Sequence, residues 1–121
     1  MIKLSIGLKR LPHLSREQFL AYWAQQHAAL VKQHAVKLGI IRYAQVHGLV
    51  ESELRASGVP DSVSSAFDGI AEIWFNDLSG AAASGRTTEG REAMKLLRED
   101  ERNFLDPMQS LVWWGTQHTV I

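Results

Sequence analysis

The sequence predicts an α+β domain whose elements follow the order βαββαβ. Four short segments have the alternating pattern or the β-branched and aromatic composition of strands, and two longer segments have apolar residues at helical spacing. The chain has 121 residues, which is enough for one hydrophobic core and too short for two. We therefore expect one domain over residues 1–121.

The first strand and the first helix have the clearest patterns. Over residues 2–8, four aliphatic side chains alternate with polar or small ones, which is the period of a strand with one buried face. Ser15 and Gln18 have the spacing of a capping box, so a helix is expected to start there. Its apolar residues recur over positions 19–38, and Gly39 stands where a left-handed residue commonly ends a helix.

The remaining elements are less regular. Residues 40–47 and 67–75 are expected to form the second and third strands, and residues 111–120 the last one. A helical region interrupted by glycines is expected over residues 78–97. The polar connection at residues 48–66 is long for a small domain, and we expect it to close over a cavity as a lid.

This element order is that of the split βαβ, or ferredoxin-like, arrangement. Two helices would cover one face of a four-stranded antiparallel sheet and leave large apolar and aromatic residues on the other face. An open face of that kind favours aggregation unless a partner covers it. We therefore expect a homodimer, in which two sheets pack face to face as a dimeric α+β barrel.

Composition excludes several classes of function. Lys and Arg number 13, as do Asp and Glu, so no basic excess favours nucleic acid as a partner. The absence of cysteine excludes disulfides, thiol nucleophiles and thiolate zinc sites. No apolar run approaches the length of a membrane span and no secretory leader is visible, so a cytoplasmic protein without membrane contact is expected.

Several motifs occur together along the chain. They are Leu14–Ser15–Arg16–Glu17–Gln18–Phe19, Tyr22–Trp23–x–x–x–His27, Arg42–Tyr43–x–Gln45–x–His47, Phe67–Asp68–Gly69–Ile70–Ala71–Glu72–Ile73–Trp74–Phe75 and Phe104–Leu105–Asp106, followed by His118–x–Val120. In this order they resemble the EthD family over nearly the whole chain. The resemblance implies a dimeric α+β barrel with a cavity between helix and sheet. It also implies kinship with proteins of ether-degradation operons and with cofactor-free enzymes of polyketide and aromatic metabolism, while related barrels bind haem or act as monooxygenases.

His27 is the first candidate for a catalytic residue. It lies one helical turn after Trp23 and beside the apolar stripe, so its ring should emerge near the sheet. An imidazole there can exchange a proton with a bound ligand near neutral pH. The alternative is a structural histidine bonded to a carbonyl or carboxylate. His34 is expected to be structural, because it lies nearer the helix end, where a cation suits the helix dipole.

Two carboxylates, Asp68 and Glu72, fall on one face of the third strand. Four residues of strand separate them by about 13 Å, which is too far for them to share a proton. Each is expected to complement or orient His27, and the alternative is an ion pair with Arg42 or Lys3, or a dimer contact.

Tyr43 completes the expected catalytic set, because its hydroxyl can polarise a carbonyl or phenol oxygen of a ligand; a place at the dimer seam is the alternative. Asp106 is expected to form a turn, and His118 to lie at the surface or in an interface. The expected substrate-binding residues, which would wall an aromatic-lined pocket, are Tyr22, Trp23, His47, Trp74 and Trp114.

The function expected from these residues is cofactor-independent acid–base chemistry on a hydrophobic aromatic or polyketide-type substrate. Such an enzyme would be a lyase, isomerase, cyclase or monooxygenase catalysing dehydration, cyclisation, isomerisation or oxygenation. The alternative is a non-catalytic small-molecule-binding or accessory protein of a degradation pathway. Haem or metal binding is the weakest option, since no two of the five histidines have the i, i+4 spacing of a zinc motif.

Overall fold

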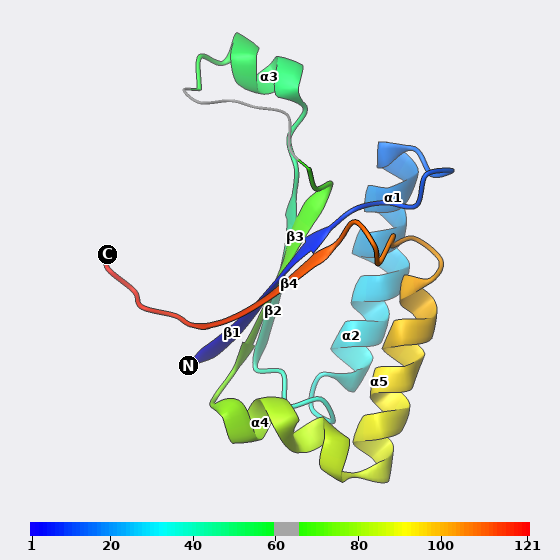
Figure 1. Ribbon diagram of the computed structural model, residues 1–121, viewed down its shortest axis with the longest axis vertical. Helices are drawn as coiled ribbons and strands as arrows, with labels where there is room; N and C mark the ends of the chain where they lie inside the picture. The colour runs from blue at the N-terminus through cyan, green and yellow to red at the C-terminus, as the bar shows by residue number, and fades with distance from the viewer. Residues whose placement is uncertain (60–65) are drawn as a thin grey trace.

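The computed structural model describes residues 1–59 and 66–121, which form a four-stranded antiparallel sheet with helices on one face (Figure 1). The strands are β1 (Ile2–Leu8), β2 (Arg42–His47), β3 (Gly69–Phe75) and β4 (Leu111–Thr116). Their order in the sheet is β2-β3-β1-β4, so the first and third strands are central. The predicted βαββαβ order is confirmed, although β2 and β3 each begin two residues later than expected and β4 ends at Thr116.

The first helical segment has three parts: α1 (Arg16–Tyr22), a π-helical turn η1 (Trp23–His27) and α2 (Ala28–His34). The capping box is confirmed, because Ser15 Oγ accepts from Gln18 N and Gln18 Oε1 accepts from Ser15 N. Turns continue to Gly39, whose φ of 71° is the left-handed conformation that glycine adopts readily. A side chain there would also collide with the Gly80 carbonyl oxygen. The π-helical turn was not expected.

The second helical region also divides, into α4 (Leu78–Ala82), a 3₁₀ turn η2 (Ala83–Arg86) and α5 (Thr88–Glu101). Asp77 and Thr87 cap α4 and α5 by accepting hydrogen bonds from Gly80 N and Gly90 N. The long helix α5 packs beside α2 over the sheet (Figure 1). The predicted region ended at residue 97, whereas α5 continues for four more residues, to Glu101. Two of these additional residues belong to the candidate functional site.

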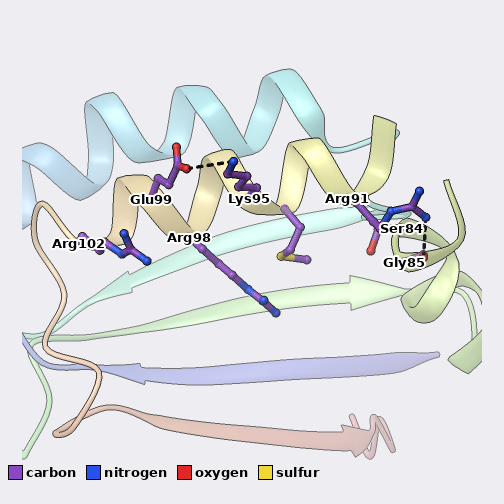
Figure 2. A pocket seen from close by; sticks show the side chains of 8 residues that line it. Ser84, Gly85, Arg91, Lys95, Arg98, Glu99 and Arg102 are labelled. Atoms are coloured by element: carbon purple, nitrogen blue, oxygen red, sulfur yellow. Dashed lines mark hydrogen bonds and ion pairs between the residues drawn. The ribbon is translucent and has the colours of Figure 1, made fainter. Parts of the chain in front are cut away.

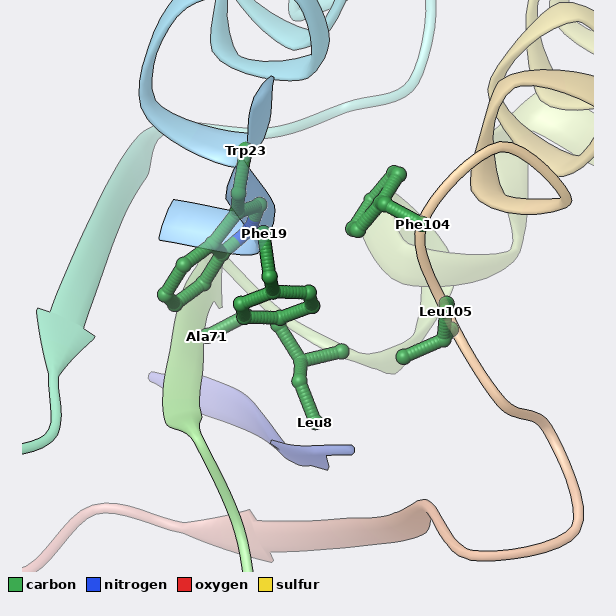
Figure 3. Close-up of a cluster of buried hydrophobic side chains, with 6 residues drawn as sticks. All are labelled: Leu8, Phe19, Trp23, Ala71, Phe104 and Leu105. Atoms are coloured by element: carbon green, nitrogen blue, oxygen red, sulfur yellow. The ribbon is translucent and has the colours of Figure 1, made fainter. Parts of the chain in front are cut away.

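Aromatic side chains join the two helical segments to the sheet (Figure 3). The rings of Phe19 and Phe104 lie 5.7 Å apart, and those of Phe19 and Trp23 lie 5.8 Å apart. All three are almost fully buried against Leu8 and Ala71 of the central strands. This cluster fixes the π-helical turn relative to the sheet and to the end of α5. A second cluster, of Val31, Leu38, Ala93 and Leu97, holds α2 against α5.

The connection between β2 and β3 contains one short helix, α3 (Glu51–Ala56). It extends away from the layer formed by α1, α2 and α5, and none of its residues is buried (Figure 1). The expectation that residues 48–66 form a lid falls partly on residues 60–65, which lie outside the described residues.

The face of the sheet opposite the helices combines charged and apolar side chains. Lys3 Nζ pairs with Glu72 at 2.8 Å, and the ring of Trp74 lies between Lys3 and Arg42, at 4.8 and 4.5 Å from its centre. Trp113 points out from the edge strand and is 67% exposed. This outer face therefore has the mixed apolar and polar character that the sequence predicted.

Candidate functional site

A cavity of about 170 Å³ lies between the helices and the sheet. Its walls come from the inward-facing residues of all four strands and from η1, α2 and α5, and most of them are aliphatic or aromatic. Among the described residues that line it, the ionisable side chains are those of His27, Tyr43 and Glu101. A few convergent polar groups in an apolar pocket are the usual pattern of a ligand site.

The volume of the cavity limits the ligand. An engineered apolar cavity of about 150 Å³ accepts benzene, so the 170 Å³ observed here fits one aromatic ring or an equivalent branched chain. A multi-ring compound exceeds this volume.

His27 reaches the cavity because it ends the π-helical turn. Such turns occur often at functional sites, since the extra residue redirects side chains within an otherwise regular helix. Here the carbonyl of Trp23 accepts from the backbone N–H of Ala28 and also from Gln45 Nε2 at 2.8 Å. The imidazole is 7% exposed, and its ring centre lies 4.9 Å from that of Phe104.

The partner of His27 is Asp100, near the end of α5. Asp100 Oδ2 lies 2.9 Å from His27 Nδ1, and Oδ1 accepts hydrogen bonds from the Tyr22 hydroxyl and from Asn103 Nδ2. Burial alone would raise the pKa of Asp100, but the hydrogen bonds from Tyr22, His27 and Asn103 outweigh it and lower the pKa. The pKa of Tyr22 is raised, by burial and by its bond to Asp100. Asp100 is therefore a carboxylate at neutral pH and Tyr22 a neutral donor.

An ionised Asp100 sets the tautomer of His27. A carboxylate accepts only, so the hydrogen of a neutral imidazole must lie on Nδ1 and the lone pair on Nε2. Nε2 makes no hydrogen bond with any described residue. In the neutral ring, Nε2 is therefore the nitrogen that can accept a proton.

Glu101 provides a second acid–base group in the same cavity. Burial raises the pKa of its carboxyl, and the nearby charges of His27 and Arg98 oppose that rise without cancelling it. Its protonated form is therefore favoured relative to an exposed glutamate. The cavity combines a potential proton acceptor, His27, with a potential donor, Glu101.

Tyr43 is positioned by a hydrogen-bonded chain behind the cavity. Gln45 Nε2 donates to the Tyr43 hydroxyl at 3.0 Å, and Gln45 Oε1 lies 2.9 Å from His47 Nε2. The ring of His47 stacks on Trp23, with centres 4.9 Å apart. Burial raises the pKa of Tyr43, so its hydroxyl stays protonated and can donate a hydrogen bond to a ligand oxygen.

Four of the residues selected from the sequence line the cavity: His27, Tyr43, Trp23 and Trp114. Tyr22 and His47, expected to bind substrate, do not line the cavity, and their side chains form hydrogen bonds with Asp100 and Gln45.

The other three selected residues lie elsewhere. Glu72 and Trp74 face outward, because they alternate along β3 with Ala71 and Ile73, which line the cavity. The predicted association of Glu72 with His27 is therefore wrong, and its alternative, an ion pair with Lys3, is observed.

Asp68 is also not a partner of His27. Its side chain is 3% exposed and accepts from the backbone N–H of Arg10 at 2.8 Å and from the Arg10 guanidinium. Lys9 Nζ lies 3.8 Å away. The carboxylate thus links the segment that follows β1 to the start of β3, which is a structural role.

Sequence reasoning missed Asp100 and Glu101. The sequence did contain a signal for Glu101. Ala93, Leu97 and Glu101 are spaced four residues apart, and the first two are buried, so Glu101 falls on the same inner face of α5. For Asp100 no comparable signal exists, because it is 73 positions from His27 and only the packing of α5 beside η1 brings the two together.

Residues 1–59 and 66–121 contain no group of three His, Cys, Asp or Glu side chains arranged to hold a metal ion. His34 is buried outside the cavity wall. None of the helices in those residues is long and apolar enough to cross a membrane.

The sequence profile of the EthD domain matches residues 11–108. No curated protein sequence matches the chain.

Three solved structures are similar to this one over almost their whole lengths. An ethyl tert-butyl ether d (EthD) family protein from Bacillus halodurans has a TM-score of 0.64 at 19% identity, covering 98% of this chain and 100% of its own. A dimeric protein of unknown function with a ferredoxin-like fold, from Bacteroides fragilis, has a TM-score of 0.57 at 10% identity, with 94% and 93% covered. A dimeric ferredoxin-like protein of unknown function from Jannaschia has a TM-score of 0.59 at 13% identity, with 96% and 98% covered. These similarities show a shared ferredoxin-like α+β fold.

Proposed function

Because this chain belongs to the EthD domain family, we propose that it is a small-molecule enzyme that transfers protons on a hydrophobic substrate bound beside His27. The observation that carries this proposal is the His27–Asp100 pair on the wall of an apolar cavity that also contains Glu101. Proton transfer needs an acceptor, a donor and a dry pocket, and the chain supplies all three from its own side chains.

In the proposed reaction, Nε2 of neutral His27 takes a proton from a substrate carbon next to a carbonyl group. Asp100 stabilises the imidazolium that forms, as the carboxylate of a catalytic triad does. The Tyr43 hydroxyl donates a hydrogen bond to the carbonyl oxygen, where negative charge develops. Glu101 delivers a proton to a leaving hydroxyl or to a second carbon. The proton on His27 then passes through solvent to the Glu101 carboxylate, so the enzyme ends in its starting state.

Dehydration, isomerisation and aldol-type cyclisation all follow this scheme. In a dehydration, the leaving hydroxyl takes the proton of Glu101 and departs as water, while the proton removed from carbon stays on His27 until it restores Glu101. The reacting part of the substrate is the size of one aromatic ring, as the cavity volume of about 170 Å³ requires. An aromatic or short polyketide-type compound fits this description.

The protein is also proposed to work as a homodimer. The two similar structures from Bacteroides fragilis and Jannaschia are described as dimeric. In this chain, Val46, Leu111 and Trp113 leave apolar surface exposed on the outer face of the sheet. A second copy packed against that face would remove this surface from water.

Deuterium exchange tests the enzymatic proposal without knowledge of the natural substrate. Single-ring ketones such as 1-phenyl-2-propanone are incubated with the protein in D₂O, and loss of the proton next to the carbonyl is followed by NMR. The wild type is expected to accelerate exchange, and His27→Gln is expected to abolish the acceleration while ketone binding persists. His13→Gln, which changes an exposed histidine outside the cavity, is the matched control.

The outcomes distinguish an enzyme from a binding protein. If the wild type binds these ketones and exchange never exceeds that of free imidazole, the protein binds ligands without acid–base catalysis and the proposal fails. If His27→Gln accelerates exchange as well as the wild type does, another residue is the base and the assignment of His27 is wrong.

A further inference from the structure

A second hollow, of about 470 Å³, lies beside α5, and half of the residues that line it are cationic (Figure 2). Arg91, Lys95, Arg98 and Arg102 project into it from successive turns. Their spacing of four, three and four residues places them on one face of the helix. Glu99 is the one carboxylate among its described lining residues, although the chain as a whole has equal numbers of acidic and basic residues. We call this hollow the cationic groove.

Two of these four cations are already engaged. Lys95 pairs with Glu99 at 3.9 Å, and the Arg91 guanidinium donates to the Gly85 carbonyl at 3.2 Å. The guanidinium groups of Arg98 and Arg102 make no hydrogen bond or ion pair with any described residue. Two guanidinium groups of the cationic groove are therefore available to an anion, and guanidinium matches the two oxygens of a carboxylate.

The cationic groove adjoins the apolar cavity. Ser84 and Met94 line both hollows, so the two are adjacent at these residues. Arg98 lies one helical turn before Glu101 on α5, about 4.5 Å along the axis, and Figure 2 shows its side chain extending from α5 toward the sheet. Its charge acts on Glu101, whose carboxyl group faces the cavity.

We propose that the natural substrate is an organic acid whose ring occupies the cavity beside His27 and whose carboxylate binds Arg98 and Arg102 in the cationic groove. This inference rests on the proposed function and specifies the substrate class for it. The cavity alone does not favour an anion, since its wall is mostly apolar and an unpaired charge is costly to bury there. The cationic groove would orient the ring by fixing the acid at one end, so that the reacting carbon faces Nε2 of His27.

Binding of two matched compounds tests this inference. 3-Phenylpropionate and 3-phenylpropanamide have nearly the same shape and differ in charge. We expect calorimetry to show the acid binding the wild type about tenfold more tightly than the amide, since a charge-assisted bond to an exposed arginine is of that order. Arg98→Gln is expected to remove most of this preference without changing the affinity for the amide, whereas Arg98→Lys is expected to keep part of it.

Controls separate this inference from the proposed function. Lys37→Gln removes an exposed positive charge outside both hollows and should leave the preference unchanged. Equal affinities of the wild type for acid and amide would refute the inference, as would a preference that survives in Arg98→Gln and Arg102→Gln. In both of those cases binding of the amide still supports the cavity as a ligand site. If neither compound binds, the cavity proposal fails and the inference fails with it.

Discussion

Replacing Asp100 by asparagine perturbs the proposed base without changing the shape of the site. Asp100 accepts from His27 Nδ1, from Tyr22 and from Asn103, and its side chain is 11% exposed. Asparagine can keep the bonds from Tyr22 and Asn103 through its oxygen, but its NH₂ group then faces His27 Nδ1. A donor in that place favours the tautomer with hydrogen on Nε2, the nitrogen that must accept the substrate proton.

The expected loss of activity is large. A wrong tautomer at a His–carboxylate pair costs about 10²- to 10⁴-fold in rate, and we expect deuterium exchange from 1-phenyl-2-propanone to fall by that factor in Asp100→Asn. Binding of the ketone should be unchanged, because Asp100 does not line the cavity. Glu99→Gln is the matched control, since it changes the adjacent, exposed carboxylate and should leave the exchange rate within about twofold.

The same substitution has a predictable effect on stability. Loss of a hydrogen bond to a charged group and of the charge itself should reduce the free energy of unfolding by about 2 kcal/mol at pH 7. The folded-state pKa of Asp100 is lowered, so its stabilising contribution is complete above the usual pKa of aspartate and is lost as pH falls through the folded-state value. Urea titrations should therefore show wild type and Asp100→Asn converging in acid. Full exchange activity in Asp100→Asn, or a stability difference that does not change with pH, would refute the account of this pair.

Three other substitutions test separate parts of the structure. Glu101→Gln should raise the free energy of unfolding at pH 7, because the folded-state pKa of Glu101 is raised and its ionisation therefore opposes folding. Urea titrations should show this gain in stability vanishing below about pH 4. A loss of stability at pH 7 would contradict the argument that burial raises the pKa. Asp68→Asn should lower the unfolding free energy by about 1.5–3 kcal/mol through loss of the charged hydrogen bond to Arg10, with little effect on the exchange rate of the folded protein; a rate loss larger than about tenfold would return Asp68 to the list of catalytic residues. Trp113→Glu should convert the proposed homodimer into a monomer in light scattering, and a variant that stays dimeric would place the interface elsewhere.

The fold could be predicted because the sequence patterns that determine its elements are local. Alternation over residues 2–8, the capping box at Ser15 and the positive φ of Gly39 each depend on a few neighbouring residues, and all agree with the structure. Alternation along the third strand also indicated two faces. Ala71 and Ile73 are apolar and Glu72 is not, so the outward position of Glu72 could have been inferred from the pattern that identified the strand.

The candidate site could be predicted only in part, because its partners come from distant segments. His27 was identifiable from its place on the apolar side of the first helix, but the π-helical turn that directs it into the cavity has no signature in hydrophobic spacing. Asp100 lies in a run of charged residues, Arg98 to Arg102. Such a run is typical of a solvent-exposed helix end, so the sequence does not distinguish Asp100 from its neighbours. The packing of α5 beside η1, fixed by Phe104 and Phe19, decides which of them meets His27.

The protonation state of the His27 ring can be observed directly by long-range ¹H–¹⁵N NMR of protein labelled at histidine nitrogens. At a pH where the ring is neutral, the account predicts a protonated Nδ1 and a bare Nε2 for His27, with the Nε2 signal shifting when 1-phenyl-2-propanone fills the cavity. A His27 ring that carries its hydrogen on Nε2, or an Nε2 signal that the bound ketone leaves unchanged, would contradict the claim that Asp100 holds His27 as a base facing the substrate.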